Sequence, residues 1–183
     1  MRRLVALFAM LSVIAIPGLA QSPKQRVVEL YPGVEYGTAI VIPAGSKLEM
    51  LPFKSDMGPL AEFRGQFTLS GTYLVDSYDP DTSATFFPDK KSRNSLPYWR
   101  DRSRPTEIYI NNGMAFADAV LPQDKLRMVK AGTLPAVRGR VTIIAEDFST
   151  SIECDAASYS ARFVMVVRPD RQIAAIPSED EGC

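Results

Sequence analysis

The sequence contains no histidine and only 2 cysteines, and these shortages exclude several classes of catalytic site. Without histidine there is no Ser-His-Asp triad, no Cys-His pair and no His-ligated zinc or copper. So few cysteines cannot build a Cys-only zinc site within one chain. A Gly-rich phosphate-binding motif and a G-x-S-x-G nucleophile elbow are also absent from the sequence. The sequence therefore favours a protein that is not an enzyme, and it implies no cofactor and no metal.

Long apolar runs are missing except near the N-terminus, where residues 4–16 follow the basic pair Arg2 and Arg3. This run is too short to cross about 30 Å of hydrocarbon as a helix. Pro17 ends it, and Gly18 and Ala20 supply the small residues that precede a signal-peptide cleavage site. We expect residues 1–20 to be a cleavable signal peptide. The mature protein is then periplasmic or secreted, with no transmembrane span.

Neither sign of charge is in excess, because 21 Lys and Arg residues balance 21 Asp and Glu residues. Loss of the basic pair with the signal peptide would leave the acidic residues slightly ahead. Binding of nucleic acid requires a basic excess, so no nucleic-acid partner is expected. A chain of 183 residues is long enough to fold as one domain. We expect a single β-rich domain over residues 21–170 and a polar tail over residues 171–183.

The two cysteines, Cys154 and Cys183, leave their own pairing open. Export would permit a disulfide between them. Cys154 is equally suited to be a small buried side chain on a strand, because it shares a parity with Ile152.

Alternation of apolar and polar residues is the main signal in the chain. From Phe63 to Val75 the apolar side chains share one parity, while Thr68, Ser70 and Thr72 share the other. This pattern predicts a strand over about 61–76 with one buried and one wet face. Two glycines inside it predict a bend, a bulge or a close approach of another backbone. Residues 137–143 repeat the pattern and predict a second strand of the same kind.

Helical signals are few and short. They cover residues 114–120, which are rich in alanine, and residues 122–130, which begin at Pro122 and are followed by Gly132. Strand signals outnumber them and do not alternate regularly with helices, which argues against a parallel sheet. The predicted fold is mainly β: a single antiparallel β-barrel or β-sandwich domain with one or two short helices inserted at about 114–130.

The irregular stretch 89–104 is the first candidate site, because basic residues outnumber acidic ones in it and aromatic residues lie in its middle. Arginine binds anions in planar pairs, and aromatic rings stack on sugars. We expect Tyr98, Trp99, Arg100 and Arg102 to contact a ligand. The partner would be an anionic glycan, a lipid headgroup or an acidic protein surface. The competing interpretation places the aromatic residues in the core and the charges in solvent.

Clustered carboxylates form the second candidate. Asp76, Asp79 and Asp81 follow the predicted long strand and suit either a calcium site or paired-carboxylate glycoside hydrolysis. The same residues are also ordinary turn formers. The adjacent pair Glu146 and Asp147 should point to opposite faces of a strand, so the two are not expected to cooperate.

These patterns lead to one leading functional hypothesis and one alternative. The leading hypothesis is an exported, non-enzymatic binding or envelope-associated interaction module. The alternative is a carboxylate-dependent hydrolase that acts on an envelope polymer. Ligand identity, oligomeric state and the choice between barrel and sandwich are left open.

Overall fold

A computed structural model describes residues 24–30, 39–53, 59–77, 84–153 and 155–176 of the protein. Its strands belong to a seven-stranded and a three-stranded sheet, joined by short helices, so the expected mainly β fold is confirmed. The strands are β1 (Arg26–Glu29), β2 (Ala39–Ile42), β3 (Glu49–Met50), β4 (Leu60–Arg64), β5 (Phe67–Asp76), β6 (Ala84–Pro88), β7 (Tyr98–Trp99), β8 (Ile108–Ile110), β9 (Ala136–Glu153) and β10 (Ala156–Ile176). The helices are α1 (Lys90–Asn94), α2 (Gly113–Val120) and α3 (Gln123–Lys130).

The larger sheet closes on itself. Its strand order is β10-β8-β6-β5-β9-β4-β3, and β10 also pairs with β9, so β5, β6, β8, β10 and β9 form a ring. All pairings in this ring are antiparallel except β8 with β10. The parallel pair arises because α2 and α3 carry the chain from β8 to β9, and β10 then runs back beside β8. The result is a small barrel-like domain of the type expected.

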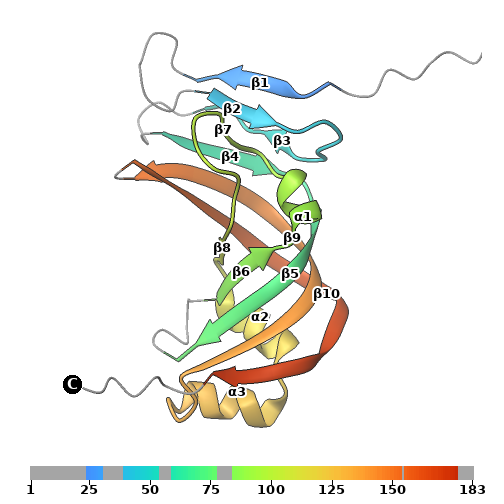
Figure 1. Ribbon diagram of the computed structural model, residues 1–183, viewed down its shortest axis with the longest axis vertical. Coiled ribbons are helices and arrows are strands. Elements are labelled where there is room, and N and C mark those ends of the chain that lie inside the picture. The colour runs from blue at the N-terminus through green and yellow to red at the C-terminus, as the bar shows by residue number, and fades with distance from the viewer. Residues whose placement is uncertain (1–23, 31–38, 54–58, 78–83, 154, 177–183) are drawn as a thin grey trace, which may run out of the picture.

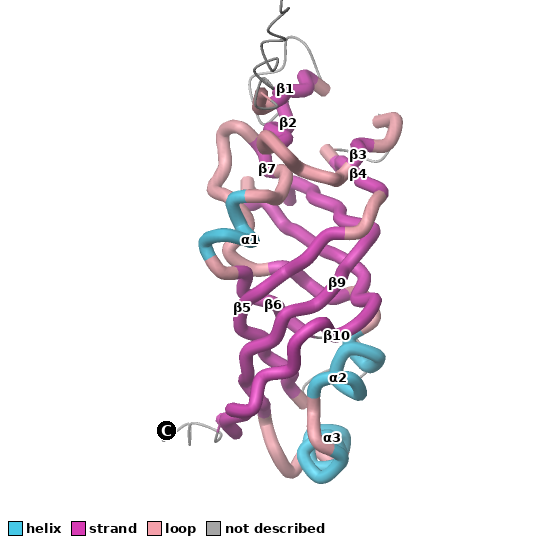
Figure 2. The backbone as a smooth tube through the Cα atoms, turned by 90° about the vertical axis from the view of Figure 1, so that its right-hand side faces the viewer, coloured by secondary structure: helices cyan, strands magenta, loops and turns pink. Residues whose placement is uncertain are grey.

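The molecule is elongated, with different elements at its two ends (Figure 1). The three-stranded sheet of β1, β2 and β7 lies at one end, and α2 and α3 lie at the other. A view turned by 90° shows the same separation, with the barrel strands between them (Figure 2). Within the described part of the chain, no helix has the length and apolar character needed to span a bilayer.

The barrel core joins inward-facing strand residues to the helical cap. Phe116 of α2 is fully buried and packs edge-on against Tyr73 and Phe163, at 5.5 and 5.4 Å between ring centroids. Such edge-to-face pairs are favourable beyond the area they bury. The helices expected at residues 114–120 and 122–130 are confirmed as α2 and α3. Gly132 follows the second of them with a positive φ of 67°, as a helix-ending glycine does.

The strand predicted over residues 61–76 is two strands. The chain breaks at Gly65, which has a φ of 116°, so β4 ends at Arg64 and β5 begins at Phe67. The other glycine, Gly71, lies inside β5, where the backbone of β6 passes so close that there is no room for a side chain. A Cβ at Gly71 would lie 2.2 Å from the carbonyl oxygen of Phe87. The expected close approach of another backbone is therefore confirmed at Gly71.

The two glycine-containing patterns found in the sequence are partners in the sheet. β5 pairs with β9 over its whole length, and Tyr73 lies opposite Gly139. A Cβ at Gly139 would lie 2.6 Å from the Tyr73 hydroxyl oxygen, so the tyrosine ring occupies the space above that glycine. The similarity of the two stretches thus reflects adjacent positions in one curved sheet.

The final two strands are the longest in the described structure, and β9 extends beyond the strand predicted over residues 137–143. β9 continues without interruption through residues 149–151. β10 continues past Pro169, and residues Ile173–Ile176 pair with Ala136–Gly139. Register shifts around Pro169 accommodate a residue that cannot donate to the ladder.

Candidate functional site

Trp99, the expected anchor of the ligand contact, is part of the core. It lies in β7 opposite Ile40 of β2 and has 0% of its surface exposed. Its indole Nε1 donates a hydrogen bond of 2.9 Å to Oγ1 of Thr150, which is itself buried. A side chain with no exposed surface cannot touch a partner. The expectation that Trp99 contacts a ligand is therefore wrong, and the competing core interpretation holds for this residue.

The charges around Trp99 are already engaged within the chain. Arg100 Nη1 donates a hydrogen bond of 2.7 Å to Glu29 Oε1. Arg102 Nη2 lies 3.7 Å from Asp155 Oδ1. The guanidinium of Arg104 lies 4.4 Å from the ring centroid of the half-buried Tyr98. These contacts fasten the segment after α1 to β1, β2 and the β9–β10 end of the barrel.

Tyr159 supports the same segment from β10. Its hydroxyl donates a hydrogen bond of 2.9 Å to the carbonyl oxygen of Ser103, and its side chain is 5% exposed. Burial raises the pKa of this phenol from its ordinary value of 10.0 to about 12, although hydrogen bonds with Trp99 and Thr150 act in the opposite direction. The folded protein therefore holds this proton more tightly than the unfolded chain does.

A pH dependence of stability follows from Tyr159. Because the folded-state pKa is raised, its contribution is complete below about pH 10 and is lost as the pH rises through about 12. We expect the free energy of unfolding to fall between these pH values. The fall should be smaller in Tyr159→Phe, which has no phenol to ionise. Urea denaturation at a series of pH values measures this, and equal slopes for the two proteins would contradict the assignment.

Of the three clustered carboxylates singled out in the sequence, Asp76 alone lies within the described part of the chain. Asp79 and Asp81 lie outside the described residues, as do Cys154 and Cys183. Asp76 ends β5 opposite Ala136. Within the described parts of the chain, no group of three His, Cys, Asp or Glu residues comes close enough to hold a metal ion.

Glu146 and Asp147 both contact the same arginine, contrary to the expectation that adjacent strand residues point to opposite faces. Asp147 has a positive φ of 51°, which breaks the alternation inside β9. Both carboxylates reach the guanidinium of Arg162 on β10, and Asp147 Oδ2 accepts from Arg162 Nε at 2.8 Å. Contact with these acids raises the pKa of Arg162, the hydrogen bond to Asp147 being the largest cause. The arrangement is a surface ion cluster, in which both carboxylates are already engaged.

The wet face of β5 has a different character. We define the β5–β9 face by the outward residues of these two strands, which pair in successive rows. Ser70 lies opposite Thr142, and their hydroxyl oxygens are 2.9 Å apart. The rows from one end of the face to the other are Thr68 with Ile144, Ser70 with Thr142, Thr72 with Arg140, and Leu74 with Arg138.

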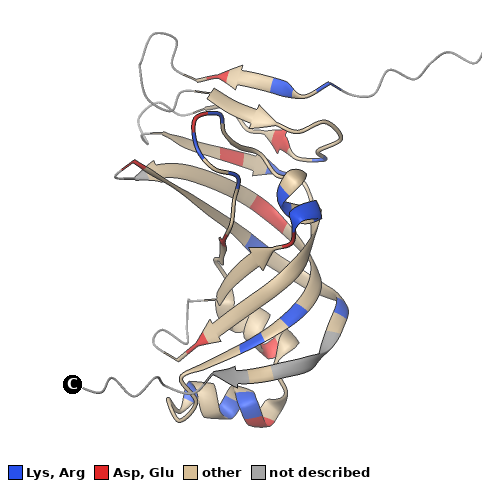
Figure 3. Cartoon of the chain, in the orientation of Figure 1, with Lys and Arg blue, Asp and Glu red and all other residues tan. Residues whose placement is uncertain are grey.

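An arginine-lined hollow opens at the middle of this face. Its volume is about 280 Å³, and β5, β9 and β10 contribute Ser70, Gly71, Arg140, Val141, Thr142, Arg168 and Pro169 to its lining. Arg168 pairs with Thr142 across the sheet, which brings it beside the Ser70 row. Neither Arg140 nor Arg168 makes a hydrogen bond or ion pair to any other part of the chain that can be described. Figure 3 shows basic residues along the lower part of β9 and at the bend of β10.

A third arginine extends the basic character of the β5–β9 face. The guanidinium of Arg138 lies 5.7 Å from the ring centroid of Phe87 on β6. A guanidinium over an aromatic face is favourable and keeps its donors free for a ligand. Three outward arginines therefore lie on β9 and β10 beside a row of hydroxyl groups.

The sequence contains a signal for this face that motifs alone do not reveal. Arg138 and Arg140 share a parity on one strand, and the strand predicted over 61–76 carries hydroxyl residues on its wet side. Only the pairing of β5 with β9 shows that these two sides coincide. The sequence favoured the 89–104 segment because it holds more charges, but the charges of Arg100 and Arg102 have partners within the chain.

Comparison of this chain with protein-family models, with curated protein sequences and with solved structures finds no match. The functional assignment therefore rests on the residues and geometry described above.

Proposed function

We propose that this protein is an exported, non-enzymatic binding domain whose β5–β9 face binds an extended acidic polysaccharide. The proposal rests on Arg140 and Arg168, which line the same hollow. Neither arginine has an intramolecular partner among the described residues. Arginine guanidinium groups form strong, charge-assisted hydrogen bonds with carboxylates. Unpaired arginines on a described surface are the groups best placed to make such bonds with a ligand.

The shape of the face favours an extended polymer. Seven residues of β5, from Thr68 to Leu74, span roughly 20 Å at about 3.4 Å per residue. The three arginines lie at its Leu74, Thr72 and Ser70 rows, which suits a polymer with one negative charge every one or two sugar rings. Duplex DNA carries one charge per about 1.7 Å and demands a denser basic surface. The overall balance of 21 basic and 21 acidic residues supports the same choice.

The polar side chains between the charges favour sugars. Ser70, Thr72 and Thr142 line the face with hydroxyl groups, which both donate and accept hydrogen bonds. Sugar hydroxyls have the same dual capacity. Phe87 adds an aromatic ring beside Arg138, and such rings pack against the apolar face of a sugar.

No observation favours the alternative, a carboxylate-dependent hydrolase. Such enzymes hold two carboxyl groups across the scissile bond. The arginine-lined hollow contains no Asp or Glu among its lining residues. Binding without hydrolysis is therefore the function that the described geometry supports best.

The double variant Arg140→Gln/Arg168→Gln is expected to bind polygalacturonate at least tenfold more weakly than the wild type, because about 1.4 kcal/mol of lost interaction corresponds to each factor of ten. Binding should also weaken with salt, since the contacts are ionic. Isothermal titration calorimetry with polygalacturonate, neutral dextran and phosphatidylglycerol vesicles measures both effects.

Arg100→Gln is the matched control, because it removes the same charge from the segment favoured by the sequence. Arg100 is held by Glu29, so this variant should bind the polymer like the wild type. Equal affinity for dextran, tighter binding to the vesicles, or full affinity in the double variant would each overturn the proposal.

A further inference from the structure

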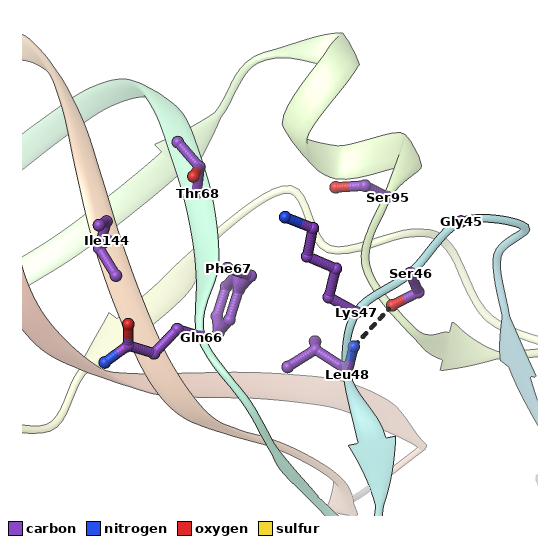
Figure 4. Close-up of a pocket in the computed structure, with 9 residues that line it drawn as sticks. All are labelled: Gly45, Ser46, Lys47, Leu48, Gln66, Phe67, Thr68, Ser95 and Ile144. Atoms are coloured by element: carbon purple, nitrogen blue, oxygen red, sulfur yellow. Dashed lines mark hydrogen bonds between the residues drawn. The ribbon is translucent and has the colours of Figure 1, made fainter.

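A second hollow lies at the end of the β5–β9 face nearest to β4. Its volume is about 370 Å³, at the small end of the range of about 300–1,000 Å³ that ligand pockets occupy. Four segments meet around it: the β2–β3 connection, the break between β4 and β5, the end of α1, and β9 (Figure 4). Lys47, Gln66, Thr68 and Ser95 contribute polar groups to its lining, and Leu48, Phe67 and Ile144 contribute apolar ones.

The only charge among these lining residues is that of Lys47. Figure 4 shows its side chain extended across the opening, with the ammonium group toward the side formed by Thr68 and Ser95. Lys47 is exposed and makes no hydrogen bond or ion pair to the described remainder of the chain. The nearby acid Glu146 is engaged by Arg162 and by Gln66 Nε2, the latter at 3.1 Å. The hollow therefore presents one available positive charge.

The neutral polar groups offer several acceptors and a hydroxyl. Ser95 Oγ donates its hydrogen to the carbonyl oxygen of Ser92 at 2.7 Å, which leaves its lone pairs to accept. Gln66 uses its amide nitrogen toward Glu146, so its carbonyl oxygen remains an acceptor. The Thr68 hydroxyl can donate or accept. A ligand that matches this set carries several hydroxyl groups and one negative charge.

The inner wall of the hollow is apolar and rigid. The Phe67 ring lies in it on the side of Lys47 and Leu48, and Ile144 lines the hollow on the other side of β5. Phe67 is held edge-on to the buried Phe148 at 5.7 Å between centroids. An aromatic ring fixed in this way offers a flat surface for the C–H face of a pyranose.

We propose that the Lys47 hollow binds a single uronic acid ring, with its carboxylate on Lys47, its hydroxyls on Gln66, Thr68 and Ser95, and its apolar face on Phe67. The ammonium group of Lys47 is a compact point charge with three donors, which can pair with the single carboxylate of such a ring. This inference rests on the proposed function in one respect, namely that the ring belongs to a polysaccharide continuing along the face. Thr68 lines this hollow and Ser70 the arginine-lined one, so the two sites are about 7 Å apart along β5.

Binding of glucuronate to the purified protein tests the inference, with chemical-shift changes in NMR spectra as the readout. We expect saturable binding of glucuronate, at least tenfold weaker binding in Lys47→Met, and no saturable binding of glucose. Lys125→Met removes a charge from α3 at the other end of the molecule and should bind like the wild type. Equal shifts with glucose, or full affinity in Lys47→Met, would overturn the inference.

The two proposals fail in distinguishable ways. Arg140→Gln/Arg168→Gln should retain glucuronate binding while losing polygalacturonate binding. In one outcome the wild type binds glucuronate, loses that binding in Lys47→Met, and yet does not bind polygalacturonate. That result would refute the proposed function and support the uronic acid site in the Lys47 hollow. Tight polygalacturonate binding without any effect of Lys47→Met on either ligand would refute the hollow alone.

Discussion

Gly71→Ala is expected to lower the free energy of unfolding by about 3 kcal/mol or more, at or above the top of the usual range of about 1–3 kcal/mol for overpacking. The new Cβ would lie 2.2 Å from the carbonyl oxygen of Phe87 and 2.9 Å from Cε1 of Phe86. Backbone atoms cannot move aside without separating β5 from β6, where Gly71 pairs with Pro88. Equilibrium denaturation in urea, followed by circular dichroism, measures the loss.

Gly45→Ala is the matched control for this prediction. Gly45 has a φ of 77°, and no atom lies within 4 Å of the position that a Cβ would occupy there. Its replacement costs only the backbone strain of a left-handed residue, about 1–2 kcal/mol. Losses of the same size at both positions would show that the close approach of β6 at Gly71 does not limit the fold.

Trp99→Ala is expected to destabilise the protein by about 3–5 kcal/mol, as truncation of a large core aromatic does. Trp99 has no exposed surface, and its ring joins β7 to β2 and to Thr150 of β9. Trp99→Phe keeps most of the packing and removes the indole hydrogen bond, which contributes about 1 kcal/mol. Thermal and urea denaturation of both variants measure the two effects separately.

This prediction also separates a core role of Trp99 from a ligand contact. At temperatures where it remains folded, Trp99→Phe should bind polygalacturonate with wild-type affinity. A variant of unchanged stability that has lost polymer binding would return Trp99 to a contact surface and contradict its assignment to the core.

The position of the candidate site follows from which charges have intramolecular partners. The segment after α1 has many basic residues, but Arg100 and Arg102 lie near Glu29 and Asp155. Ion pairs of this kind contribute little to stability, yet they offset charges that a ligand would need. Arg140 and Arg168 have no such partners in the described structure. The availability of charge, more than its density along the chain, therefore identifies the β5–β9 face.

Local patterns determined much of the secondary structure. Alternation placed Leu69, Tyr73 and Val75 on the buried side of β5 and Thr68, Ser70 and Thr72 on its outer side, and the structure confirms this division. The two helices could be predicted because their punctuation by Pro122 and Gly132 is local. These features depend on neighbours in the chain, so they are readable from the sequence.

Partnership between distant residues required the tertiary structure. No local sequence pattern predicts that Ser70 and Arg168 both pair with Thr142, or that Arg100 donates a hydrogen bond to Glu29. The break at Gly65 and the uninterrupted β9 depend in the same way on which backbone passes nearby. The amino-acid sequence by itself determined a mainly β domain and the side chains that each strand presents to its two faces. The tertiary structure decided that the wet sides of β5 and β9 form one surface, because side-chain direction is set locally whereas pairing is set by closure of the barrel.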